Sequence, residues 1–122
     1  MEKKTILIID DDARNIFALK AMLLAKKFQC ISCNGAAEAL ELLKTDEKVD
    51  FVLIDMMMPD IDGYEAIPLI KRIEKRKATV VYAVTAQAMV GDREKCIRAG
   101  ADDYISKPID VDKLLTLLRT CE

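Results

Sequence analysis

The feature that most constrains the fold is a regular alternation of short apolar runs with longer amphipathic stretches. Near-continuous apolar runs occur at Thr5–Ile9, Val52–Ile54 and Val80–Val84. Strands of a parallel sheet that is covered on both faces have this composition, because both of their faces are buried. The stretches between the runs are long enough to be the crossover helices that parallel strands require. The sequence therefore predicts an α/β fold with a parallel sheet.

From these runs we expect five strands and five helices in alternation. The strands are predicted at Thr5–Ile9, Gln29–Cys33, Val49–Ile54, Thr79–Val84 and Ala101–Ile105. The helices are predicted at Arg14–Lys27, Ala36–Lys44, Gly63–Lys75, Ala88–Ala99 and in a last stretch that bears Val111, Leu114, Leu115 and Leu118. We expect Asp12 and Asp110 to cap the helices that they precede, and Gly100 to end the fourth helix. A chain of 122 residues without linker or repeat suits one domain, residues 1–122, with no second domain encoded.

Composition excludes several classes of function. The chain has no histidine, so the Ser-His-Asp and Cys-His arrangements of nucleophilic enzymes are impossible. Its four glycines are too far apart for a GxGxxG or Walker phosphate loop. The net charge of -2 does not favour nucleic-acid binding, and we expect none. No apolar run approaches the roughly 20 residues of a membrane helix, so we expect a cytoplasmic protein without a membrane contact.

The four cysteines are expected to be reduced thiols. Cys30 and Cys33 lie in one predicted strand, where their Cα atoms would be roughly 10 Å apart. That separation exceeds the limit of about 7 Å for a disulfide. With no histidine and no second CxxC, a zinc site is not expected either.

Polar residues gather where the predicted strands end. In open parallel sheets, ligands bind beyond the carboxyl ends of the strands. These ends carry Asp10, Asp11 and Asp12 after the first strand, Asp55 after the third, Thr85 after the fourth, and Lys107 and Pro108 after the fifth. Each residue alone has an ordinary explanation, as a helix cap, a solvated acid, a strand residue or a surface lysine. Their joint placement at one edge of the sheet is what indicates a site.

Carboxylates that converge at a sheet edge repel one another unless a cation lies between them. Hard oxygen ligands of this kind suit Mg²⁺, which usually shares its coordination shell with water and phosphate. A carboxylate beside such a cation and a lysine can attack phosphorus and form an aspartyl phosphate. We therefore interpret Asp55, a charged residue at the end of an apolar strand, as a phosphoryl acceptor whose burial is offset by the metal and Lys107.

Four segments in order, ILIIDDD, VLIDMMMPDIDG, AVTA and DDYISKP, resemble those of response regulator receiver domains over nearly the whole chain. The resemblance implies a flavodoxin-like, doubly wound (βα)5 fold with a five-stranded parallel sheet in the order 2-1-3-4-5. It also implies a phosphoacceptor signalling domain of a two-component phosphorelay. Such a domain is not an enzyme, although it assists its own phosphorylation and a slow dephosphorylation.

The resemblance implies a role for each residue of the site. Asp55 corresponds to the phosphorylated aspartate, and Thr85 and Lys107 to the hydroxyl and ammonium groups that contact the phosphoryl group. Asp10 and Asp11 correspond to the acidic pair that holds Mg²⁺, with Asp11 the more direct ligand, and the backbone carbonyl of Met57 completes the set. Thr85 and Tyr104 correspond to the switch residues, and the Lys107–Pro108 peptide bond is expected to be cis.

The finer pattern, including DDARN, MMMPDIDGYEAI and AGADDYISKP, resembles receivers of hybrid histidine kinases. This implies a histidine kinase or a histidine phosphotransfer domain as partner, and a downstream effector that the sequence does not identify. The expected readout surface is formed by the fourth helix, the fifth strand and the fifth helix. Met57 and Gln87 correspond to residues that flank the phosphoryl group, and neither is a good base for water, so we expect slow hydrolysis.

Two other functions remain open on these residues. A haloacid-dehalogenase-like phosphohydrolase also forms an aspartyl phosphate, but it carries a second aspartate where this chain has Met57. A receiver-like interaction module that is never phosphorylated is the other alternative, and the complete set of polar residues argues against it. Stable single phosphorylation, rapid turnover or no reaction with acetyl phosphate and Mg²⁺ would separate the three.

Overall fold

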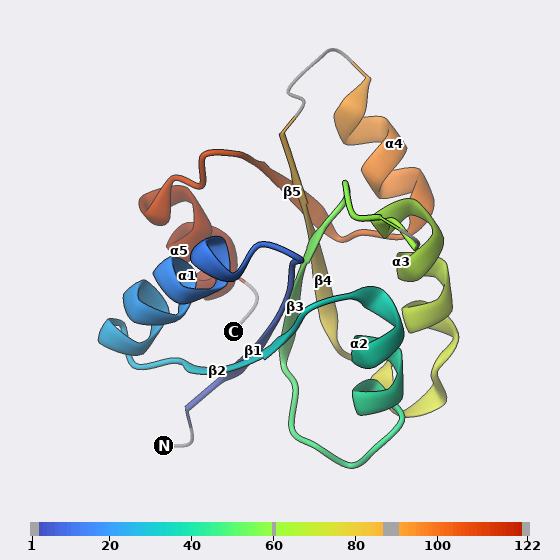
Figure 1. The fold of residues 1–122 in the computed structure, drawn as a ribbon, viewed down its shortest axis with the longest axis horizontal. Helices are drawn as coiled ribbons and strands as arrows, with labels where there is room; N and C mark the ends of the chain where they lie inside the picture. Colours follow the sequence, from blue (N-terminus) through green and yellow to red (C-terminus); the bar gives the residue numbers. More distant parts are fainter. Residues whose placement is uncertain (1–2, 60, 87–90, 121–122) are drawn as a thin grey trace.

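The computed structural model describes residues 3–59, 61–86 and 91–120. Within these residues, five parallel strands form one sheet in the order β2-β1-β3-β4-β5 (Figure 1). The strands are β1 (Thr5–Ile9), β2 (Gln29–Cys33), β3 (Phe51–Asp55), β4 (Val80–Thr85) and β5 (Asp103–Ser106). The fold class and the strand order predicted from the sequence are confirmed. The order reverses between β1 and β3, and their carboxyl ends lie side by side at that switch point.

Helices cover both faces of the sheet. They are α1 (Ala13–Ala25), α2 (Ala36–Leu43), α3 (Gly63–Arg72), a short 3₁₀ helix η1 (Glu74–Arg76), α4 (Asp92–Ala99) and α5 (Val111–Thr120). Figure 1 shows α1 and α5 on one face and α2, α3 and α4 on the other. In the described part of the chain, no helix has both the length and the apolar character that a membrane span needs.

Each face of the sheet has its own apolar core, because successive side chains of a strand point to opposite faces. Ile6 and Ile8 of β1 pack on one face with Leu19 of α1 and Leu114 of α5. The residues between them, Leu7 and Ile9, pack on the other face with α2 and α3. All five residues of β1 and of β3 are buried. These two central strands form the rigid support from which the site residues project.

Strands β1 and β2 have their predicted bounds, whereas β3, β4 and β5 each end one residue later than the sequence predicted. Asp55 is the last residue of β3 and is paired in register with Val84, and Thr85 is the last residue of β4 and is paired with Ser106. The three strands β3, β4 and β5 also begin one or two residues later than predicted. The apolar pattern marks burial, and burial extends beyond the residues that pair: Val49 is buried although β3 begins at Phe51.

The third helix is shorter than predicted. It ends at Arg72, and the extended backbone of Ile73 leads into η1. Arg76 of η1 is buried and donates hydrogen bonds to the carbonyl oxygens of Leu43 at 2.8 Å, Thr45 at 2.9 Å and Glu47 at 2.7 Å. These contacts satisfy the carbonyl groups at and after the end of α2, and they explain why the chain leaves the α-helical path.

The other helix ends largely follow their predicted signals. Asp12 accepts a hydrogen bond from the Arg14 N–H at the start of α1, and Asp110 accepts one from the Asp112 N–H before α5. Gly100 ends α4 with a left-handed backbone, φ 117°. The first helix ends at Ala25 rather than at Lys27, whose φ of 72° is not helical. Residues 88–90 of the predicted fourth helix lie outside the described residues.

The cysteines that the structure describes are free thiols, as predicted: Cys30, Cys33 and Cys96. Burial, with the charge and hydrogen bond of Glu38, raises the pKa of the Cys33 thiol to about 11. Cys121 lies outside the described residues.

Candidate functional site

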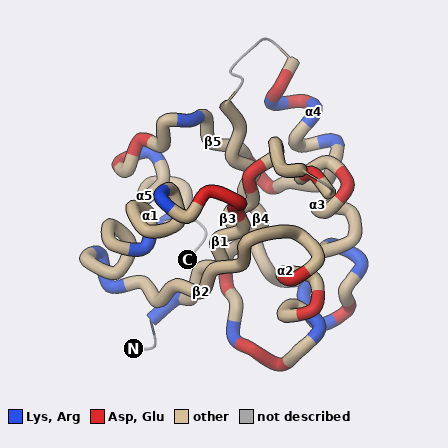
Figure 2. The backbone as a smooth tube through the Cα atoms, viewed as in Figure 1, with Lys and Arg blue, Asp and Glu red and all other residues tan. Residues whose placement is uncertain are grey.

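Three carboxylates meet at the switch point of the sheet. Asp10 follows β1 directly and Asp55 ends β3, and their exposed fractions are only 3% and 5%. Asp11 is exposed beside them. One oxygen from each of the three carboxylates lies within 4.8 Å of the others. Figure 2 shows the acidic segment between β1 and α1 at the carboxyl edge of the sheet. The structure therefore brings together the three aspartates that the sequence singled out.

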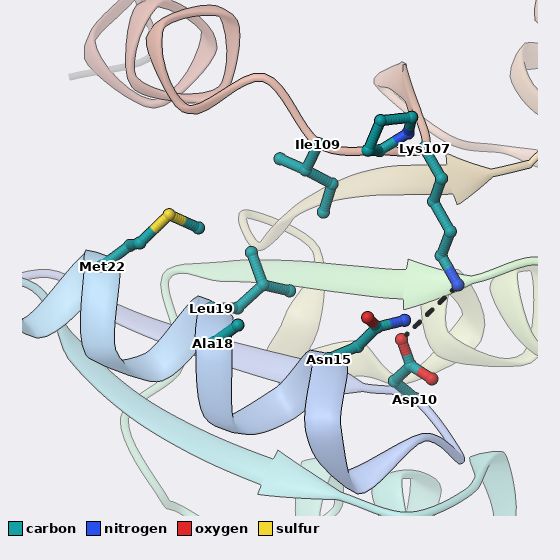
Figure 3. A pocket seen from close by; sticks show the side chains of 8 residues that line it. Asp10, Asn15, Ala18, Leu19, Met22, Lys107 and Ile109 are labelled. Atoms are coloured by element: carbon teal, nitrogen blue, oxygen red, sulfur yellow. Dashed lines mark ion pairs between the residues drawn. The ribbon is translucent and has the colours of Figure 1, made fainter.

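Lys107 supplies the positive charge of this cluster. Its Nζ lies 3.1 Å from Asp55 Oδ2. The same Nζ lies 3.7 Å from Asp10 Oδ2, the ion pair marked in Figure 3. The Lys107 backbone N–H donates to the Thr85 carbonyl oxygen at 2.7 Å, which ties the loop after β5 to the end of β4. With three carboxylates and one ammonium, the site retains an excess of negative charge that suits a cation.

Asp10 and Asp55 are held in the same way. Asp10 Oδ1 accepts a hydrogen bond from the Asp12 backbone N–H at 2.8 Å, and Asp55 Oδ1 accepts one from the Met57 N–H at 3.0 Å. In both carboxylates the other oxygen, Oδ2, faces Lys107. Each side chain is thus fixed by its own following turn before any ligand binds.

The pKa values of buried Asp10 and of half-buried Lys107 are shifted by different balances of burial and charge. Burial raises the pKa of the Asp10 carboxyl above its usual value, although the Asp12 N–H and the Lys107 charge work against this rise. For Lys107, burial lowers the pKa, but the hydrogen bond and charge of Asp55, with the charges of Asp10 and Asp11, outweigh it and leave the pKa raised. Lys107 is therefore cationic at neutral pH.

The donor set fits Mg²⁺. Its ligands would be carboxylate oxygens alone from the side chains, two of them buried and one exposed to solvent, and hard oxygen ligands with room for water are what Mg²⁺ prefers. The backbone carbonyl of Met57 as a further ligand remains a prediction. Lys107 lies 3.1 Å from Asp55 Oδ2, so a metal ion on the side of the cluster near Asp11 would not compete with it for the same space.

The other predicted residues that the structure describes lie on β4, on β5 and in the segments after β3 and β5. Thr85 is buried at the end of β4, next to the strand that carries Asp55. Tyr104 of β5 is half-buried and packs against the core on the α3 side of the sheet. The Lys107–Pro108 peptide bond is cis. Of the three methionines after Asp55, Met57 is 57% exposed whereas its neighbours are buried. Gln87 lies outside the described residues.

Asn15 is a residue of this region that the sequence analysis did not identify. With Asp10 and Lys107 it lines a cavity of about 430 Å³ between α1 and the chain after β5. The other lining residues are Ala18, Leu19, Met22, Pro108 and Ile109. Asn15 begins a stripe with helical spacing (positions 15, 18, 19 and 22) on one face of α1, and this spacing is the signal that could have revealed it.

Comparisons with known proteins agree with this site. The family model described as "Response regulator receiver domain" matches residues 6–119. The signal transduction histidine-protein kinase BarA of Escherichia coli is 37% identical over 114 residues, which are 93% of this chain and 12% of BarA. The polar-differentiation response regulator DivK of Brucella ovis is 31% identical over 117 residues, 96% of this chain and 94% of DivK.

A solved structure with a similar fold is the receiver domain of the sensor histidine kinase PA1611 of Pseudomonas aeruginosa. It is 29% identical, with a TM-score of 0.87 over 98% of this chain and 97% of that domain, and it holds a magnesium ion in its active-site cleft. The family match spans almost the whole sequence and includes every residue of the cluster. The chain therefore belongs to the family of response regulator receiver domains of two-component signalling systems.

Proposed function

We propose that Asp55 is the phosphoryl acceptor of this receiver domain and that its donor is a phosphohistidine on a histidine kinase or a histidine phosphotransfer domain. The observation that carries the proposal is the position of Asp55: a buried carboxylate at the end of a central strand, held by the Met57 N–H and by Lys107. A buried charge is costly unless it is paired, and a site that maintains this charge beside two further aspartates is suited to chemistry.

Each residue of the site has its own role in the proposed phosphoryl transfer. An oxygen of Asp55 attacks phosphorus, while the Met57 N–H and Lys107 keep the carboxylate in position. Lys107 and the Thr85 hydroxyl then contact the oxygens of the new phosphoryl group. Asp10, Asp11 and Asp55, with the Met57 carbonyl, would hold Mg²⁺, which neutralises phosphoryl charge when it is bound. Phosphoryl transfer needs mainly positioning and charge neutralisation, and this set supplies both.

The magnesium ion in the related PA1611 receiver supports the choice of metal. The similarity to BarA and PA1611 supports a histidine-based donor, since both are named as histidine kinases. The chain spans 12% of the length of BarA.

A phosphohydrolase is the less suitable alternative. Such an enzyme needs an acid or base two residues after the nucleophile, and the side chain there is the thioether of Met57, which is largely exposed. We therefore propose that the aspartyl phosphate is a signalling state rather than an intermediate of rapid turnover. An unphosphorylated interaction module would not need the paired Asp55 and Lys107.

Intact-mass spectrometry after incubation with acetyl phosphate tests this function. We expect one phosphoryl group to be added to the wild-type protein in Mg²⁺ and none to be added in EDTA. Asp55→Asn keeps the shape but removes the nucleophile, so it should remain unmodified. Asp46→Asn, which changes an exposed aspartate far from the cluster, is the matched control and should react as the wild type does. Equal phosphorylation of Asp55→Asn and wild type would overturn the proposal.

A further inference from the structure

The cavity beside the site has a polar end and an apolar remainder. Asp10, Asn15 and Lys107 form the polar end, and apolar side chains of α1 and of the loop after β5 form the rest. Figure 3 shows Asn15 projecting from the first turn of α1 to lie beside the Asp10 carboxylate, at the same end as the Lys107 ammonium. The cavity thus opens directly onto the lysine that contacts Asp55.

The Asn15 side chain has hydrogen-bonding capacity that the described part of the chain does not use. It is half-buried, and no described residue forms a hydrogen bond with it. A primary amide offers two N–H donors without adding charge. The cluster already contains three carboxylates. A further carboxylate at position 15 would repel a phosphoryl dianion, and a cationic side chain there would pair with Asp10 instead. A neutral donor is therefore suited to contact a phosphoryl oxygen at this point.

We propose that Asn15 is a donor-binding residue: its amide N–H donates to an oxygen of the incoming phosphoryl group, while the carrier of that group lies along the apolar wall of the cavity and leaves as a neutral molecule. The proposal rests on Asp55 being the acceptor. With protonated phosphoimidazole as donor, the P–N bond breaks, its electron pair stays on the ring nitrogen, and neutral imidazole leaves as the P–O bond to Asp55 forms.

Phosphorylation rates of Asn15 variants test this role. They are measured by intact mass at saturating Mg²⁺ with two donors, phosphoimidazole and phosphoramidate, which share the phosphoryl group but differ in carrier. Asn15→Ala should slow the reaction about 5-fold with both donors, the effect of losing one hydrogen bond of ordinary strength in a partly solvated site. Asn15→Asp should slow it at least about tenfold, because the added charge repels the donor. Asn15→Gln, which keeps the amide, should retain most of the rate.

Controls separate this role from a structural one. Phe17→Ala changes an exposed residue of the same helix that does not line the cavity, and its rate should equal that of the wild type. The melting temperature and the Mg²⁺ affinity of Asn15→Ala, from calorimetry, should also be unchanged. A fall in Mg²⁺ affinity that accounts for the slower rate would contradict direct donor binding.

The outcomes also distinguish this inference from the function on which it rests. If Asn15→Ala reacts as fast as the wild type while Asp55→Asn does not react, Asn15 has no role and Asp55 remains the acceptor. If Asp55→Asn reacts as the wild type does, the acceptor itself is wrong. Slowing with phosphoimidazole alone would mean that Asn15 contacts the carrier, and it would overturn the proposed contact with the phosphoryl group.

Discussion

Asp10 brings a negative charge into a buried position, and the raised pKa of its carboxyl shows that the ionised form is less stable in the folded protein than in the unfolded chain. At neutral pH this charge therefore costs folding free energy when no metal is bound. Asp10→Asn removes the charge, and its amide oxygen can still accept the Asp12 N–H. We expect the variant to melt a few degrees higher than the wild type in EDTA, since about 1 kcal/mol corresponds to roughly 4 °C.

In Mg²⁺, we expect the wild-type protein to melt at a higher temperature than Asp10→Asn. The wild-type protein should be stabilised by the metal, whereas Asp10→Asn should gain little, because it has lost one of the three carboxylates proposed to hold Mg²⁺. Thermal melting followed by circular dichroism, with and without Mg²⁺, measures both effects. A variant that melts lower than the wild type in EDTA would show that the Asp10 charge is not a cost to the fold.

Met57 should influence how long the phosphorylated state lasts. Its side chain is exposed and close in the chain to Asp55, the proposed acceptor, and a thioether is a poor hydrogen-bond partner for water. Met57→Asn offers an amide that can orient a water molecule near phosphorus, so it should speed dephosphorylation several-fold; each tenfold corresponds to about 1.4 kcal/mol of barrier. Loss of the phosphoryl group is followed by mass spectrometry after the donor is removed. Equal or slower loss from the variant would contradict this role.

The turn between β3 and α3 depends on a close approach of two backbone segments. The Gly63 N–H donates to the Met56 carbonyl oxygen at 3.3 Å, and a Cβ on Gly63 would lie 2.8 Å from Met56 Cα. Gly63→Ala must therefore displace the backbone at Met56 and at Met57, whose N–H donates to Asp55. We expect this substitution to destabilise the protein by about 1–3 kcal/mol. Gly35→Ala is the matched control, because nothing lies within 4 Å of its added Cβ. Urea denaturation compares the two, and equal stabilities would contradict the steric explanation.

The strands and the strand-end residues were predictable because both leave local marks in the sequence. Apolar runs predict the strands. Asp10 and Asp55 come directly after such runs, and Lys107 comes shortly after the last of them. The end of α3 was not predictable, since it depends on contacts between Arg76 and carbonyl groups about 30 residues earlier in the chain. Asn15 was missed because an amide in the first turn of an amphipathic helix is ordinary until the cavity beside it is known.

Across the whole molecule, phosphorylation should bias the packing of the sheet edge at β4 and β5. A phosphoryl group adds about -1.5 to -2 charge and strong acceptor oxygens beside Thr85. Drawing the Thr85 hydroxyl inward would open space for Tyr104, which is half-buried on the neighbouring strand. We expect beryllofluoride with Mg²⁺ to shift NMR signals of α4, β5 and α5, and to leave those around Arg76 and Leu43 unchanged. The same addition to Asp55→Asn should have no effect.

Unchanged signals at Tyr104 and its neighbours in the wild-type protein would count against this readout surface. They would leave the acceptor itself untested, because the switch and the transfer are separate properties.

Chemical identification of the phosphorylated residue tests the central claim most directly. Borohydride reduces an aspartyl phosphate to homoserine and leaves free aspartates unchanged. The protein is incubated with acetyl phosphate and Mg²⁺, reduced, digested and mapped by tandem mass spectrometry. We expect homoserine at position 55 and at neither position 10 nor position 11, and no homoserine when EDTA replaces Mg²⁺. Homoserine at another aspartate, or its absence from position 55, would contradict the assignment of Asp55 as the phosphoryl acceptor.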